Sequence, residues 1–116
     1  MAQGAALDLQ TLRDLFGDDT EVIREILEAY ALDLQQRSAD LYAAANDRDR
    51  TRFGRIAHSL KGASANVGAA DFAGVCAAAE KKAAGAPWPE LDAACRELTG
   101  DAAALCAAVR EHLTAL

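Results

Sequence analysis

The side chains best suited to chemistry lie close together around His58, in the segment from Gly54 to Gly68. An imidazole is nucleophilic near neutral pH and can accept a phosphoryl group on a ring nitrogen. Lys61 follows three residues later, one turn away in a helix, so its ammonium group can offset part of the charge of such a group. Arg55 is a second, more distant cation. This spacing suits phosphoryl transfer through a histidine, and the alternative, a surface histidine without a function, is equally open on helical position alone.

The phosphoryl donor for such a site must already be activated. An exposed charge pair contributes only about 1 kcal/mol at about 4 Å, too little to form a nitrogen–phosphorus bond from unactivated phosphate. The eight glycines are scattered, and none builds a Gly-rich phosphate loop with its lysine. We therefore expect no autokinase activity and no cofactor of the chain's own. An acyl phosphate on a partner's aspartate is a suitable donor and acceptor, with Mg²⁺ in the partner.

Helical geometry separates the histidine from the core of this segment. At roughly 100° per residue, His58 lies roughly 160° from Leu60. Four residues fall within about 40° of Leu60 and form the predicted core face: Phe53, Ile56, Ser64 and Val67. We therefore expect the imidazole to face solvent.

Small residues surround His58 on the helical wheel. Glycine inside a helix costs about 1 kcal/mol relative to alanine, so Gly54 and Gly62 weaken this helix without forming a turn. Close approach of another molecule explains both. We expect Gly54, Arg55 and Ala65 to contact a partner and Gly62 to give it access to the ring.

Glu80 is a candidate for orienting the ring. It lies about 40° from Cys76, at the edge of an apolar helical stripe, so it can reach the histidine helix and accept a hydrogen bond from one nitrogen. The other nitrogen would then be the nucleophile. The alternative, that Glu80 pairs only with a neighbouring lysine or with solvent, is equally open.

The hydrophobic pattern that must position these residues is helical throughout. It predicts a short helix over 9–16, a long one opening near 18–21 and ending near 45, two more over 50–67 and 71–84, and a last one from Pro89 through Leu113. The segment 18–21 resembles a capping box, and Gly100 is expected to bend or interrupt the last helix. The fold class is all-α: an antiparallel up-down four-helix bundle with a short extra N-terminal helix as a lid.

Bulk properties narrow the class of protein. A chain of 116 residues suits one domain over 1–116, and a net charge of −6 argues against nucleic-acid and membrane partners. With no signal peptide or membrane span, we expect a cytoplasmic protein. Cys76, Cys95 and Cys106 are spaced for neither disulfides nor metal ligands, so small buried side chains are expected and no metal site.

The run His58-Ser59-Leu60-Lys61-Gly62, followed by Ser64-Ala65-Asn66 and Gly68-Ala69, resembles the histidine-phosphotransfer (HPt) family of phosphorelays. Gly17-Asp18-Asp19 before it, and Phe72, Val75, Cys76 and Glu80 after it, extend the resemblance over nearly the whole chain.

The resemblance implies a role for each matching residue. His58 is phosphorylated on a ring nitrogen, Lys61 supports the phosphoryl group, and Gly62 leaves room for a receiver domain. The implied partners are response-regulator receiver domains and a hybrid histidine kinase, and the chain is expected to act as a monomeric phosphocarrier rather than as an enzyme. It would accept the phosphoryl group from the phospho-aspartate of one receiver and pass it to the aspartate of another.

One position departs from the family pattern. Many members have serine directly after the motif glycine, where this chain has Ala63, and its hydroxyl comes one residue later, at Ser64. Because Ser64 is on the core face, we expect it to bond back to a preceding carbonyl and not to the phosphoryl group.

Other readings remain for the chain and for two side chains. A helical adaptor that binds a kinase or receiver without transferring phosphate is the alternative function, which the sequence leaves open. The dimerising hairpin of a histidine kinase is disfavoured, because it would need two long helices and an attached ATP-binding domain, neither of which the sequence indicates. Trp88 is expected to pack at a turn, and His112 to complement the charge at a helix C-terminus.

Overall fold

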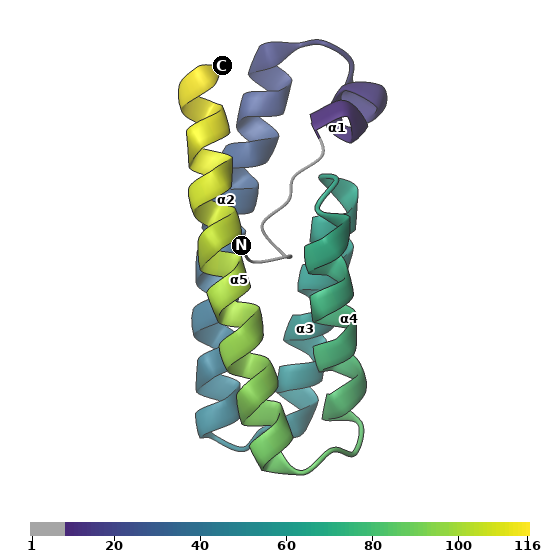
Figure 1. Ribbon diagram of the computed structural model, residues 1–116, viewed down its shortest axis with the longest axis vertical. Coiled ribbons are helices and arrows are strands. Elements are labelled where there is room, and N and C mark those ends of the chain that lie inside the picture. The colour runs from purple at the N-terminus through teal and green to yellow at the C-terminus, as the bar shows by residue number, and fades with distance from the viewer. Residues whose placement is uncertain (1–8) are drawn as a thin grey trace.

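Five helices make up the part of the chain that the computed structural model describes, residues 9–116 (Figure 1). They are α1 (Leu9–Phe16), α2 (Thr20–Asn46), α3 (Arg50–Asn66), α4 (Ala70–Ala83) and α5 (Trp88–Ala115). The all-α class is confirmed, and the predicted helix ends differ from these by only one or two residues.

The four longer helices form a closed ring in which each packs against the next. Contacts join α2 to α3, α3 to α4, α4 to α5 and α5 back to α2, as an antiparallel up-down bundle requires. The α3–α4 hairpin is shorter than the α2–α5 pair, and α1 lies at the end of the bundle where that hairpin turns (Figure 1). The predicted bundle with an extra N-terminal helix is confirmed.

The core runs along the axis of the bundle and consists mainly of leucine, alanine and two phenylalanines. All five residues predicted for the core face of α3 are buried: Phe53, Ile56, Leu60, Ser64 and Val67. The three cysteines are also buried and free, as predicted. Burial raises the pKa of the Cys76 thiol to about 12, because the thiolate would be poorly solvated there.

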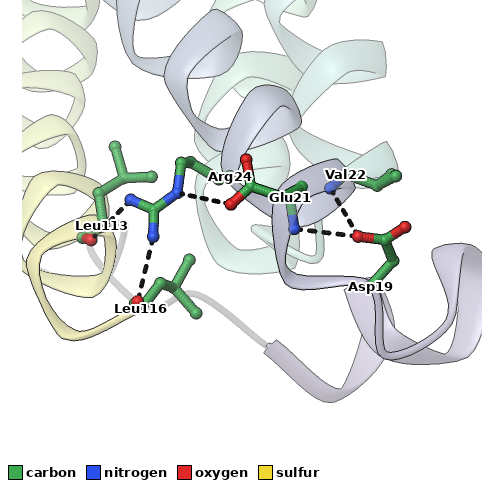
Figure 2. Close-up of polar contacts among 6 residues, drawn as sticks. All are labelled: Asp19, Glu21, Val22, Arg24, Leu113 and Leu116. Atoms are coloured by element: carbon green, nitrogen blue, oxygen red, sulfur yellow. Dashed lines mark hydrogen bonds and ion pairs between the residues drawn. The ribbon is translucent and has the colours of Figure 1, made fainter.

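The start of α2 is capped by an aspartate (Figure 2). An oxygen of Asp19 accepts hydrogen bonds from the backbone N–H groups of Glu21 at 3.0 Å and Val22 at 3.4 Å. Because the cap is Asp19, the third helical position holds Val22, so Glu21 is too early to complete a capping box. The cap lies within the predicted segment 18–21, one residue later than the predicted reciprocal box requires, and that box is wrong.

Arg24 ties this end of α2 to the last turn of α5 (Figure 2). Its guanidinium donates to the carbonyl oxygens of Leu113 at 3.3 Å and Leu116 at 3.0 Å, and lies 3.8 Å from the carboxylate of Glu21. The last carbonyls of a helix have no partner within the helix, so the arginine satisfies groups that would otherwise need water.

The opposite end of the bundle closes around Trp88, which packs at the turn before α5 as predicted. Its ring meets Phe53 edge-on with centroids 6.5 Å apart, and the guanidinium groups of Arg48 and Arg50 lie 4.8 and 5.1 Å from its centre. The last helix begins at Trp88, one residue earlier than predicted, and it runs without interruption past Gly100.

Candidate functional site

The imidazole of His58 projects from α3 away from the core. Its side chain is 65% exposed, whereas Leu60, on the other face of the same helix, is fully buried. The predicted outward orientation is therefore confirmed, and the ring is accessible to a docking protein.

Glu80 on α4 bridges the two polar side chains of α3. One of its oxygens lies 2.8 Å from Nδ1 of His58, and the other accepts a hydrogen bond of 2.8 Å from Nζ of Lys61. The predicted contact with the ring is confirmed. The alternative, that Glu80 pairs only with a neighbouring lysine or with solvent, is wrong, because its two carboxylate oxygens serve His58 and Lys61 at once.

The bridge determines which ring nitrogen is free. The hydrogen bonds from Lys61 and His58 lower the pKa of the Glu80 carboxyl, and its partial burial opposes this only in part. An ionised carboxylate can only accept hydrogen bonds, so Nδ1 of His58 must carry the hydrogen. The lone pair of the neutral ring is then on Nε2, the ring nitrogen that Glu80 leaves free.

Lys61 is held by Glu80 in this state and does not stand alone beside the ring. Its ammonium group has three hydrogens, of which the bond to Glu80 uses one, so it retains donors for an incoming phosphoryl oxygen. Sequence reasoning placed the lysine correctly and missed this bond, because it depends on how α4 lies against α3.

A groove of about 550 Å³ lies beside His58 between α3 and α4. Residues that line it include Arg50, Gly54, Arg55, His58, Glu80 and Ala83. Arg50 was not among the predicted site residues. It donates hydrogen bonds to the carbonyl oxygens of Ala83 at 3.4 Å and Ala86 at 2.7 Å, a cross-helix contact that residue spacing cannot reveal.

The two glycines near His58 have different surroundings. A methyl group added at Gly62 would meet no atom within 4 Å, so this glycine leaves open space next to the ring. At Gly54 the same methyl would lie 3.3 Å from Cβ of Ala83. Close packing of α3 on α4 therefore explains why position 54 is a glycine. The sequence had indicated only contact with a partner.

A family model decides the identity of this bundle. The Hpt domain model matches residues 25–116, more than half of the chain. The chain belongs to the Hpt domain family. Hpt domains are phosphocarriers of phosphorelays, which interact with receiver domains and kinases, and they are not enzymes.

A solved structure is similar to this Hpt domain over nearly its whole length. It is the crystal structure of histidine-containing phosphotransfer protein B (HptB) from Pseudomonas aeruginosa PAO1, with a TM-score of 0.82 and 26% sequence identity. The similarity covers 95% of this chain and 96% of that one. A comparison with curated proteins found no match.

Ser64 in this Hpt domain has a different partner from the one predicted. Its buried hydroxyl lies 2.6 Å from the hydroxyl of Tyr30 on α2, where a bond back to a carbonyl of α3 was expected. The serine does face the core and not the phosphoryl site. Tyr30 is buried in the core, and nothing in the sequence paired it with Ser64.

The remaining predicted residues of the Hpt domain lie on its surface. Arg55 and Ala65 are exposed on α3, and their contact with a partner stays a prediction. His112 lies in the last turn of α5. Within residues 9–116, no group of three or more His, Cys, Asp or Glu side chains is arranged to hold a metal ion. No helix in the same range has the length and apolar character needed to cross a bilayer.

Proposed function

We propose that this Hpt domain carries a phosphoryl group between receiver domains on Nε2 of His58. The lone pair of Nε2 attacks the phosphorus of a phospho-aspartate, the bond from phosphorus to the aspartyl oxygen breaks, and the aspartate leaves as a carboxylate. Attack of a second receiver's aspartate on the phosphohistidine reverses these changes. The contact of 2.8 Å between Nδ1 and Glu80, beside an otherwise exposed ring, carries this proposal.

Glu80 serves this transfer as a positioning residue. It holds the hydrogen on Nδ1 and leaves Nε2 free, and its negative charge stabilises the positive charge that the ring gains when Nε2 bonds to phosphorus. Lys61, held by the same carboxylate, is placed to donate to a phosphoryl oxygen. Gly62 gives the partner access, because nothing fills the space beside it.

The partner supplies the rest of the chemistry. We place the Mg²⁺ that spreads the phosphoryl charge in the receiver domain, and we propose a hybrid histidine kinase as the original source of phosphate. The buried free cysteines fit a reducing compartment, so the cytoplasm is the proposed location.

Transfer of label tests the proposal directly. A receiver domain of the source organism, phosphorylated with labelled acetyl phosphate, is incubated with the Hpt domain. We expect label on the wild-type chain and none on His58→Gln. His112→Gln is the matched control, since these are the two histidines of the chain, and it should accept label normally. Binding without any label on the wild-type chain would support the adaptor function instead.

A second experiment tests the positioning role of Glu80. Glu80→Ala should slow transfer at least tenfold, about 1.4 kcal/mol in activation free energy. It should also change the ¹⁵N shifts of the His58 ring, because the hydrogen is no longer held on Nδ1. Slowing of less than twofold, or unchanged ring shifts, would show that Glu80 only supports the structure.

A further inference from the structure

Charge is divided unequally between the two halves of the bundle. Helices α3 and α4 together carry six basic and two acidic residues, a net charge of +4. Helices α2 and α5 carry four basic and ten acidic residues, a net charge of −6. The chain is acidic as a whole, yet the half that presents His58 is positive.

Several cations of this half keep their charge unneutralised. Lys61 is paired with Glu80, but Arg50 is bound to carbonyl oxygens and to the Trp88 ring, which carry no net charge. Arg55 and Lys81 are exposed and form no ion pair within residues 9–116.

Two of these cations lie beside the His58 ring. Arg50 and Arg55 line the groove beside His58, and its one acidic lining residue, Glu80, already shares its carboxylate between His58 and Lys61. Lys81 follows Glu80 on α4. We define the basic face as the surface of α3 and α4 that carries the half-buried Arg50 and the exposed Arg55 and Lys81.

We propose that the basic face attracts and orients an acidic surface of the receiver domain, with Arg55 as the main steering residue. This rests on the proposed function and adds to it the kind of partner surface that fits. A phosphorylated aspartate brings negative charge to His58 in any case, and acidic residues around it would complement the groove. A long polyanion such as nucleic acid would also meet the acidic α2–α5 half, so a compact acidic protein surface is the better fit.

Such attraction acts mainly on the rate of encounter. Charged surfaces that complement each other raise association rates by about 10- to 1,000-fold, and salt weakens the effect because the Debye length is only about 10 Å at 0.1 M. We therefore expect the rate of phosphotransfer to fall markedly as ionic strength rises, when the receiver concentration is limiting.

Two charge reversals of equal size test the role of position. Arg55→Glu on the basic face and Arg110→Glu on α5 each change the net charge by two, and both arginines are exposed and form no ion pair within the described chain. At low salt, Arg55→Glu should lower kcat/KM for transfer from the phosphorylated receiver about tenfold, with the loss in KM. Arg110→Glu should stay within twofold, and the difference should vanish near 0.5 M NaCl. Equal effects of the two variants, or no effect of salt, would overturn the inference.

Binding measured without transfer separates this inference from the proposed function. Unphosphorylated receiver is titrated into ¹⁵N-labelled Hpt domain at low salt and at about 0.5 M NaCl. We expect salt-sensitive amide shifts on α3 and α4 and none on α5. Such shifts without phosphotransfer would support the basic face and refute the carrier function. Phosphotransfer that depends neither on salt nor on Arg55 would support the carrier function and refute the role of the basic face. Amide shifts centred on α5 would also overturn the inference.

Discussion

The α3–α4 hairpin and the α2–α5 pair differ in length, in charge and in the side chains that they present. The hairpin consists of helices of 17 and 14 residues and carries His58, its polar partners and an excess of positive charge. The α2–α5 pair consists of helices of 27 and 28 residues, contributes most of the buried leucines and is acidic outside. Chemistry is therefore concentrated in the shorter pair, and the longer pair supplies the support.

This difference explains why the site can contain unfavourable features. Gly62 weakens α3, and the exposed ring of His58 buries little apolar surface. Neither would help a helix that had to be stable by itself. The long helices bury enough apolar area to hold the hairpin in place, so residues there can serve access and charge rather than stability.

The largest effect on stability is expected from a cavity in the α2–α5 pair. Leu98 on α5 is fully buried, so Leu98→Ala should lower the free energy of unfolding by about 2–5 kcal/mol, measured with urea. Leu32→Ala on α2, where the leucine is 66% exposed, is the control and should cost less than about 0.5 kcal/mol. Transfer per folded molecule should be unchanged in both. A specific loss of transfer in Leu98→Ala would show that the halves are not separate in function.

A smaller effect is expected where the halves meet, at the hydroxyl pair of Tyr30 and Ser64. Ser64→Ala leaves the buried phenol without its partner and should cost about 1–3 kcal/mol. Tyr30→Phe should cost less, because a serine in a helix can turn its hydroxyl to a preceding carbonyl. The double variant should be more stable than the sum of the single losses implies. Simple additivity in urea unfolding would mean that the pair contributes no coupling.

Alanine substitutions at the two glycines of α3, Gly54 and Gly62, compare two positions within the α3–α4 hairpin. Gly62→Ala has open space and should raise the free energy of unfolding by up to about 1 kcal/mol while slowing transfer. Gly54→Ala is the matched variant, and its gain should be smaller, because the methyl would press on Ala83 at 3.3 Å. Thermal unfolding and transfer assays measure both. An equal gain at the two positions would contradict the packing role of Gly54.

The smallest expected effect is on the titration of Glu80. Its pKa is lowered in the folded chain, so its bridge is present at neutral pH and is lost as the pH falls through that lowered value, below the ordinary 4.5. Lys61→Met removes the largest cause and should raise the pKa of Glu80, measured from the ¹³C shift of its carboxyl. Lys82→Met also removes one positive charge, from a lysine of α4 that is not bonded to Glu80. It should raise the pKa of Glu80 much less. Equal shifts would mean that the general field, and not the bridge, holds the carboxylate.

Local patterns predicted most of the architecture and the centre of the site. The spacing of apolar residues indicated the helices, and the wheel placed His58 opposite Leu60, because both depend only on neighbours in one helix. The predicted bond between His58 and Glu80 needed one further step, the assumption that α4 lies beside α3. The capping box failed because a shift of one residue in the start of α2 moves Glu21 out of reach.

The sequence by itself determined the helices, the outward imidazole and the phosphotransfer motif, since each follows from the identity and spacing of residues within one helix. Only the tertiary structure decided that Glu80 serves His58 and Lys61 at once, that Ser64 meets Tyr30, and that Gly54 fits against Ala83. These contacts join different helices, and their distances depend on the rotation and spacing of each helix in the bundle. No periodicity within a single segment contains that information.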